Sequence, residues 1–420
     1  MSRDQMLFTH LTERKWIVLS GLFVIYMASN GITLHTLPLL YPELIESFGW
    51  QASEVTLPAT VFFLIGAITS PPAGWLLDKY SPRKIIMVGS LTLSLALIGF
   101  SQVQGLWQLV AVYACLGVGL SLCGLVSNMV VLTAWFNEKR GRATGILLMA
   151  SSLGGVLFPL AVGAALAAHG WRSTLLGVGF ATGAFMIGSA WFLLRDKPSG
   201  TTRVELDRVQ PGTEGFTGGL TDVLRQIDFY KVLFLTGSLW FVIIALTQHQ
   251  SIYLTQDVGL SKAQLPGLFS LFFACSVLGK LGFGILSEHF SVSRVMAASN
   301  LTLATALILL TQVRADSHWL LLSYAAIAGV GFSGAFTCIQ LLVAHLYRGP
   351  SYGRILAVVV LADTLCGALG TRLIGLARES QGDYRSALAG LIALSLIATM
   401  LVMTFKTDNA AGRSLTQPET

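Results

Sequence analysis

Twelve long apolar runs, separated by short clusters of polar and turn-forming residues, make up most of the chain. Each run can cross the hydrocarbon core of a bilayer, roughly 30 Å thick, as a helix of about 20 predominantly apolar residues. Membrane β-strands need only about 9–11 residues of alternating polarity, and the runs show no such alternation. The pattern therefore predicts an all-α integral membrane protein with twelve transmembrane helices. The expected helices span residues 16–40, 54–77, 85–103, 106–136, 143–168, 172–194, 229–254, 262–286, 295–313, 318–347, 355–378 and 385–405.

The composition supports this interpretation and excludes several classes of protein. Of 420 residues, 54% are hydrophobic and 11% are charged, and the mean hydropathy is +0.69. Soluble domains carry about 25% charged residues, so a soluble enzyme or a nucleic-acid-binding protein is excluded. The five cysteines all lie in apolar runs without the spacing of a metal or redox motif, and we interpret them as packing residues. We expect no metal and no cofactor.

The positive charges indicate how the helices are oriented. Of the 27 lysines and arginines, 20 lie in segments on the side of the N-terminus, 5 on the opposite side and 2 within the runs. Lys and Arg concentrate in cytoplasmic loops, so we expect both termini in the cytoplasm. Residues 1–15 precede a run without a cleavage pattern, which is typical of a retained span. The short loops and the lack of a targeting segment favour a multi-pass protein of the plasma membrane, in a bacterium the inner membrane.

The longest polar stretch falls near the middle of the chain. Residues 195–228 are rich in Gly, Thr, Pro and charge, which is typical of a linker. We expect an N-terminal six-helix bundle at 1–194, the cytoplasmic linker at 195–228, a C-terminal six-helix bundle at 229–405 and a cytoplasmic tail at 406–420. The halves repeat each other, since Gly117-Val-Gly119 recurs 212 residues later as Gly329-Val-Gly331. Such a repeat fits two parallel bundles around an axis normal to the membrane.

The loop after the second run carries a recognisable motif. It reads Gly74-Trp-Leu-Leu-Asp78-Lys79-Tyr-Ser81-Pro-Arg83-Lys84, which resembles the signature G-x-x-x-D-[RK]-x-G-[RK]-[RK] of the major facilitator superfamily. Ser81 stands where the family has its second glycine. The resemblance implies the major facilitator fold and a conformational latch, in which the glycine allows two helices to approach and the acid binds a helix end or a basic partner. The alternative is a set of solvated loop charges that cap two helices.

The latch residues come from both halves, because the motif is echoed 210 residues later by Gly284-x-x-x-Glu288. The expected members are Gly74, Asp78, Lys79, Arg83, Arg142, Gly284, Glu288 and Arg294.

A finer resemblance concerns the entry to the fifth run. The segment Trp135-Phe-Asn-Glu-Lys-Arg-Gly-Arg-Ala-Thr-Gly145, together with Phe48-Gly-Trp50, is similar to monocarboxylate porters and oxalate/formate exchangers. This resemblance implies a secondary transporter that moves a small organic anion, a mono- or dicarboxylate, by alternating access. It also implies coupling by proton symport or by anion exchange, and a protein that works as a monomer. Ser276 stands where the proton-coupled branch carries an acid, which argues against simple symport.

Three ionisable residues within runs are candidates for substrate binding, since each costs about 2.5–3.5 kcal/mol to insert at the centre of a bilayer. Lys280 lies where related carriers bind the carboxylate with an arginine, or it extends its ammonium to the interface. His35 holds the anion or relays a proton, or is a packed histidine. Asp363 forms a charge pair with Lys280 that an incoming anion opens, or it forms a hydrogen bond to a neighbouring helix.

Uncharged polar residues within the runs complete the expected site. Asn30, His249 and Gln340 could line the path of a substrate, or could join helices to one another. The expected substrate-binding set is therefore His35, Lys280, Asp363, Asn30, Gln340 and His249.

Other classes of transporter are less favoured. The chain has no phosphate-binding G-x-x-x-x-G-K-[ST] motif, so we expect no ATP-driven transport. Tyr113 stands where proton-coupled drug exporters have an arginine. Two alternatives remain open, an exporter of uncharged or amphipathic molecules and a membrane sensor that kept the fold without turnover.

Overall fold

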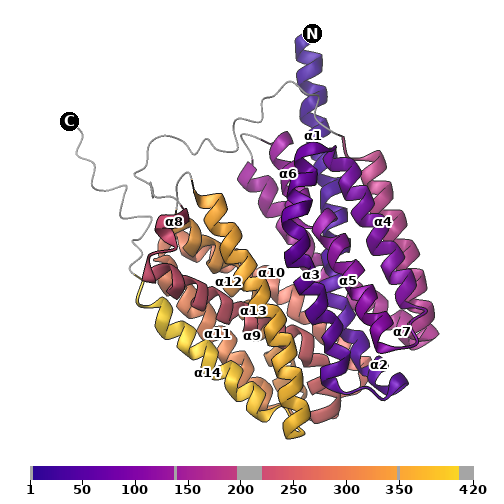
Figure 1. The fold of residues 1–420 in the computed structure, drawn as a ribbon, viewed down its shortest axis with the longest axis vertical. Coiled ribbons are helices and arrows are strands. Elements are labelled where there is room, and N and C mark those ends of the chain that lie inside the picture. The colour runs from indigo at the N-terminus through magenta and orange to yellow at the C-terminus, as the bar shows by residue number, and fades with distance from the viewer. Residues whose placement is uncertain (1–2, 137–139, 196–219, 348–350, 406–420) are drawn as a thin grey trace. The chain divides into compact units, whose positions relative to one another are not determined.

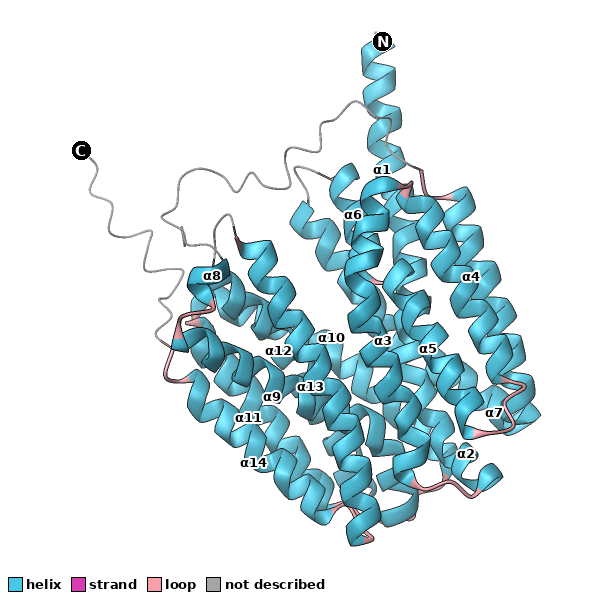
Figure 2. Cartoon of the chain, viewed as in Figure 1, coloured by secondary structure: helices cyan, strands magenta, loops and turns pink. Residues whose placement is uncertain are grey.

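The computed structural model describes residues 3–136, 140–195, 220–347 and 351–405 (Figure 1). This part of the chain is built from helices and contains no strand, as Figure 2 shows. Eleven of its helices are long and apolar enough to cross a membrane, and one of these merges two predicted spans. The predicted all-α architecture with twelve spans is therefore confirmed. Most of the expected linker and the whole expected tail, 196–219 and 406–420, lie outside the described residues.

The contacts divide the chain into two compact units. Unit 1 comprises Met1–Ser199 and Lys262–Ser270, and unit 2 comprises Gly200–Ser261 and Leu271–Thr420. The helices that begin in the first 199 residues are α1 Arg3–Asn30, η1 Gly31–Thr36, η2 Leu37–Leu40, α2 Tyr41–Phe48, α3 Ala52–Lys79, α4 Pro82–Phe100, α5 Leu106–Cys123, α6 Leu125–Trp135 and α7 Arg140–Phe192. The remainder are α8 Leu220–Val223, α9 Ile227–Ile252, η4 Tyr253–Asp257, η5 Lys262–Gln264, α10 Leu265–His289, α11 Val292–Gln312, α12 His318–Leu346, α13 Tyr352–Gln381 and α14 Arg385–Val402.

A short stretch of the second half belongs to unit 1. Lys262 contacts the carboxylates of Glu43, at 3.2 Å, and Glu46 in α2. The Ser270 hydroxyl, in the first turns of α10, donates a hydrogen bond of 2.9 Å to the carbonyl of Val156 in α7. The sequence assigns these residues to the C-terminal bundle, but their ion pairs and hydrogen bonds are with the first half of the chain.

Glycines mark two breaks in the helices of unit 1. Gly170, with φ 72° and ψ 167°, separates the fifth and sixth predicted spans within α7, a conformation that a residue without Cβ adopts at low cost. Gly124, with ψ −151°, separates α5 from α6 within the fourth span. The Asn128 side chain donates to the carbonyls of Cys123 and Gly124, each at 2.7 Å. Asn128 therefore satisfies carbonyls at the break.

The first span is also irregular, because it passes from α-helix to a π-helical turn, η1, and then to the 3₁₀ segment η2 at Pro38. The Thr36 hydroxyl donates to the carbonyl of Gly31 at 2.7 Å. His35 lies in this π turn, a type of segment found frequently at functional sites.

The helices α9 and α13 pack closely against each other in unit 2. A Cβ on Gly370 would lie 2.7 Å from the carbonyl oxygen of Phe241, and one on Gly237 would lie 2.8 Å from the Cys366 sulfur. The absence of side chains at these glycines lets the two helices run side by side at close approach. This α9–α13 seam carries two of the candidate site residues, Asp363 and His249.

Candidate functional site

Lys280 lies against an aromatic surface built from two other helices of unit 2. Its Nζ is 5.8 Å from the centroid of the Phe336 ring on α12, and that ring meets Trp240 of α9 edge to face at 5.9 Å. A lysine over an aromatic ring is attracted by the ring quadrupole. Leu278 and Leu281, its neighbours on α10, are 66% and 49% exposed, whereas Lys280 is half-buried. The ammonium therefore turns toward α12.

Gln340 lies one turn beyond Phe336 on α12. Residues four apart share one face of a helix, so Gln340 lies on the side of α12 that meets Lys280. The sequence groups Lys280 and Gln340 only as members of one candidate set, and the structure adds that Gln340 lies on the face of α12 that Lys280 approaches.

Asp363 is the one carboxylate of the candidate set, and it is deeply buried. The residue is 1% exposed, and in the described part of the chain neither carboxyl oxygen has a hydrogen-bond or ion-pair partner. The predicted pair between Asp363 and Lys280 is therefore not formed in this conformation. The Thr236 hydroxyl of α9 faces the carboxyl, yet its Oγ1 also lacks a partner with hydrogen-bond geometry.

His249 stands at the other end of the same seam and is fully engaged. Its Nε2 lies 2.8 Å from the carbonyl oxygen of Thr371, and its Nδ1 lies 2.9 Å from the Tyr384 hydroxyl. A carbonyl only accepts hydrogen bonds, so Nε2 donates, and the neutral ring then accepts from Tyr384 at Nδ1. Burial raises the pKa of Tyr384 well above its ordinary value, so this phenol keeps the proton that it donates.

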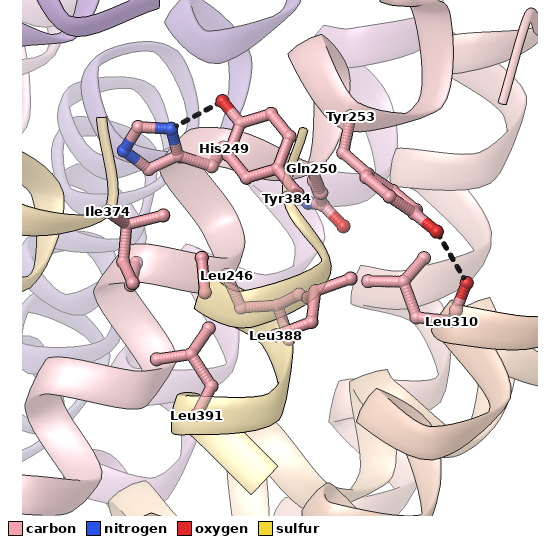
Figure 3. Close-up of a pocket in the computed structure, with 11 residues that line it drawn as sticks. Leu246, His249, Gln250, Tyr253, Leu310, Ile374, Tyr384, Leu388 and Leu391 are labelled. Carbon is pink, nitrogen blue, oxygen red and sulfur yellow. Dashed lines mark hydrogen bonds between the residues drawn. The ribbon is translucent and has the colours of Figure 1, made fainter. Parts of the chain in front are cut away.

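Figure 3 shows His249 and Tyr384 pointing toward one another at a small pocket in unit 2. Leucine and isoleucine side chains, including Leu388 and Ile374, form much of the lining. The Tyr253 hydroxyl donates to the carbonyl of Leu310 at 3.1 Å beside it. The pocket is therefore bordered by polar side chains that already bond one another or the backbone.

Further polar contacts surround this end of unit 2, and sequence reasoning missed them. The Tyr324 hydroxyl donates to Gln250 Oε1 at 2.9 Å. The guanidinium of Arg378 forms an ion pair of 2.9 Å with Asp257, whose second oxygen accepts from the backbone N–H of Tyr384 at 3.1 Å. These partners lie 74 to 127 residues apart, and no local pattern identifies such pairs.

The two candidates of unit 1 have partners close by. His35 is 8% exposed, and its Nε2 lies 3.0 Å from the Ser151 hydroxyl of α7. The Asn30 amide donates to the carbonyl of Tyr26 at 3.3 Å, within its own helix. A close approach of Gly31 to Gly154 brings α7 beside this segment, since a Cβ on Gly31 would lie 2.7 Å from the Gly154 Cα.

The expected latch residues of the first loop have several roles. Arg83 donates to the carbonyls of Ala190 at 3.0 Å and Trp191 at 2.6 Å, so it caps the C-terminal end of α7, where positive charge is favoured. Lys79 lies 3.9 Å from the centroid of the Trp75 ring. Asp78 is exposed.

The latch glycines do not mediate a close approach here. A Cβ on Gly74 or on Gly284 would meet no heavy atom within 4 Å, so the reason given for these glycines from the sequence does not hold in this conformation. Arg142, Glu288 and Arg294 are exposed. Asn137 to Lys139, within the segment that resembles the carboxylate carriers, lie outside the described residues.

Comparison with known proteins extends these observations. The chain is 22% identical over 376 residues to "Uncharacterized MFS-type transporter YcxA" of Bacillus subtilis (strain 168), covering 88% of this chain and 90% of that protein. It is 23% identical to "Probable galactarate/D-glucarate transporter GarP" of Escherichia coli (strain K12), with 84% of each chain covered. A shorter match, 32% identical over 159 residues and covering 37% of this chain and 36% of the other, is to "Agnestins efflux protein AgnL12" of Paecilomyces divaricatus.

The fold is that of a solved transporter. A bacterial homologue of the human lysosomal transporter Spinster, in an inward-facing and occupied conformation, superposes with a TM-score of 0.70 at 16% identity, covering 96% of this chain and 97% of the other. The sequence profile of the Major Facilitator Superfamily matches residues 18–252 and again residues 233–419. With the predicted spans found as helices, the chain is a multi-pass membrane transporter, not an enzyme, and it belongs to the Major Facilitator Superfamily.

Proposed function

We propose that the protein is a secondary active transporter that moves a small organic anion, a mono- or dicarboxylate, by alternating access. The observation that carries this proposal is Lys280, a half-buried cation in the middle of an apolar helix with its ammonium against Phe336 of α12. A buried cation is costly without a functional reason, and a carboxylate is the partner that its charge favours. The resemblance to GarP, whose name refers to dicarboxylic sugar acids, supports the same class of substrate.

Each polar candidate has a proposed role. Lys280 attracts the carboxylate as a point charge, since it lacks the bidentate fork of arginine. Gln340, on the same side of α12, and His35 and Asn30 of unit 1 contribute hydrogen bonds. His249 would have to give up Tyr384 or Thr371 to bind a substrate, so its contribution is to support the others.

The finer assignment follows the carboxylate carriers. We assign the chain to the branch that resembles monocarboxylate porters and oxalate/formate exchangers, coupled by proton symport or by anion exchange. It acts as a monomer in the plasma membrane, the inner membrane of a bacterium, with both termini in the cytoplasm. The loop residues Asp78, Glu288, Arg142 and Arg294 act as a latch in another conformation of the cycle.

A second candidate function is export of uncharged or amphipathic molecules. The match to a fungal efflux protein favours it, as does the aromatic pair Trp240 and Phe336 beside Lys280. An exporter would lower the cellular content of its compound, and neutralising Lys280 would leave its transport intact.

The test is uptake of radiolabelled formate, oxalate, L-lactate and D-glucarate into proteoliposomes, for the wild type, Lys280→Gln and the control Arg314→Gln. Arg314 is exposed in the loop before α12. A charge-assisted contact contributes about 1.5–3 kcal/mol, so Lys280→Gln should lower the uptake rate by more than about tenfold, while Arg314→Gln retains it. Uptake of none of the carboxylates by the wild type would contradict the proposal and favour the exporter.

A further inference from the structure

Asp363 holds a buried carboxyl group that no described protein group satisfies. Resting on the proposed function, we propose that this carboxyl binds the coupling proton, so that the carrier is a proton symporter and not an anion exchanger. The proposal gives Asp363 a role separate from the substrate contacts of Lys280. It stands on the placement of the carboxyl within the α9–α13 seam.

The seam is apolar one helix turn before the carboxyl. Val359 on α13 and Val232 on α9 lie four residues before Asp363 and Thr236, and both belong to a fully buried apolar cluster with Phe229 and Ile355. On the other side, Gly237 meets the Cys366 sulfur and Gly370 meets the Phe241 carbonyl at close approach. The carboxyl is therefore enclosed by packed helices, where water is excluded.

The titratable and charged groups of the elements around α13 leave the carboxyl uncompensated. On α9, Asp228 and Lys231 pair with each other at 2.7 Å and His249 bonds Thr371 and Tyr384. On α13 itself, Cys366 is adjacent, and Arg354 and Arg372 are each nine residues away, about 14 Å along the helix axis. The other groups are Asp222 of α8, Arg385 at the first position of α14, Tyr230 of α9 and Tyr347 after α12. Burial raises the pKa of Tyr347 to about 12, so it is neutral.

An ionised carboxylate in this position would lack both water and a partner. Burial of an unpaired charge is so unfavourable that such groups take up a proton instead. In this conformation Asp363 is therefore the neutral acid, and it loses its proton when the seam admits water in another conformation of unit 2. A proton bound in one conformation and released in the other is the requirement for coupling.

A metal ion fits the position less well than a proton does. Hard cations take six or more oxygen ligands, whereas the seam offers the carboxyl of Asp363 and the hydroxyl of Thr236. Within the described residues, no group of three or more His, Cys, Asp or Glu side chains could hold a metal ion. Protonation needs the carboxyl alone.

The experiment compares the wild type, Asp363→Asn and the control Asp316→Asn in proteoliposomes to which radiolabelled D-glucarate, oxalate, formate or L-lactate is added on the outside. Asp316 is an exposed carboxylate in the loop before α12. For one proton per monoanion, an inward gradient of one pH unit drives up to about tenfold accumulation, which we expect for the wild type and Asp316→Asn. Asp363→Asn should accumulate nothing, while its exchange of labelled for unlabelled substrate should lose all dependence on pH, because asparagine mimics the neutral acid permanently.

A second measurement needs no substrate. The infrared difference spectrum between purified wild type and Asp363→Asn, both in detergent at neutral pH, should contain the carbonyl stretch of a protonated carboxylic acid. A correctly folded Asp363→Asn protein, judged by gel filtration and melting, makes the comparison valid, and Asp363→Leu serves if the asparagine variant misfolds.

The outcomes separate this inference from the proposed function. A wild type that transports none of the four carboxylates contradicts the proposed function, and the infrared band then still decides whether Asp363 is protonated. Gradient-driven accumulation that persists in Asp363→Asn overturns the proton site, as does the absence of the band. Accumulation that follows a sodium gradient, or wild-type exchange without any response to pH, overturns it as well.

Discussion

Two polar positions of the α9–α13 seam differ in how their buried side chains are satisfied. They are Asp363 and the contact between His249 and Thr371, about 12 Å apart along α13. At one, both ring nitrogens of His249 are bonded, to Thr371 and Tyr384. At the other, both oxygens of Asp363 are buried without a partner. A satisfied buried group stabilises the fold modestly, whereas an unsatisfied one costs free energy and is retained for another reason. The difference indicates that His249 holds the seam together and that Asp363 serves transport.

The largest expected effect is the loss of the His249 contacts. In His249→Leu, the Tyr384 hydroxyl stays buried without its acceptor and two hydrogen bonds are lost, so we expect the free energy of unfolding to fall by about 3 kcal/mol. Thermal melting in detergent measures this change. Tyr384→Phe, which removes one hydroxyl, should cost about 1 kcal/mol, and the double variant should cost no more than His249→Leu alone. Additive losses would show that the pair does not act as a unit.

Adding a methyl group within the seam should have the next largest effect on the free energy of unfolding. A Cβ at Gly370 would lie 2.7 Å from the Phe241 carbonyl oxygen, so Gly370→Ala must separate α9 from α13 and should cost about 2 kcal/mol. The matched control is Gly390→Ala on α14, where a Cβ meets no atom within 4 Å and alanine gains up to about 1 kcal/mol in helix propensity. Equal melting temperatures for the two variants would show that the seam is not tightly packed.

Substitution of Asp363 should change the free energy of unfolding in the opposite direction. Replacing an unsatisfied buried carboxyl with a hydrocarbon of similar size removes the cost of its burial, so Asp363→Leu should raise the free energy of unfolding by about 1–2 kcal/mol while abolishing gradient-driven accumulation. Melting and uptake are measured on the same preparation. A destabilised Asp363→Leu would mean that the carboxyl has a stabilising partner, and the comparison between the two positions would fail.

The sequence predicts the architecture because hydrocarbon thickness fixes the length of each apolar run. The twelve spans follow from that rule alone, and the Gly170 kink within α7 falls between two of them. The breaks at Gly124 and in the π turn around His35 could not be predicted, since they lie within uninterrupted apolar runs. Nearby side chains satisfy the carbonyl groups that such breaks free, as the Asn128 amide does for the carbonyl of Cys123.

The sequence predicts which residues belong to the candidate site, because polar and charged side chains are costly to bury in a membrane, but it does not predict how they are arranged. Asp363 and Lys280 stand out because any charge in an apolar run is expensive. Their pairing is wrong for this conformation because complementarity of charge does not supply geometry, which depends on how α10 and α13 pack. The partners of His249 lie 122 and 135 residues away, and Tyr384 lies in a loop with no motif around it.

The smallest expected effect tests the neighbour of the carboxyl. If Asp363 is a neutral acid that needs no donor, removing the Thr236 hydroxyl should change the free energy of unfolding by less than about 1 kcal/mol, because Oγ1 is itself buried without a partner. Thr236→Val keeps the shape of the side chain and should retain gradient-driven accumulation. Thr247→Val, about three turns further along α9, is the control, since its hydroxyl donates to the carbonyl of Ile243 within its own helix. A large loss of coupling in Thr236→Val alone would mean that the hydroxyl stabilises an ionised Asp363, and the carboxyl would then resemble the satisfied position at His249.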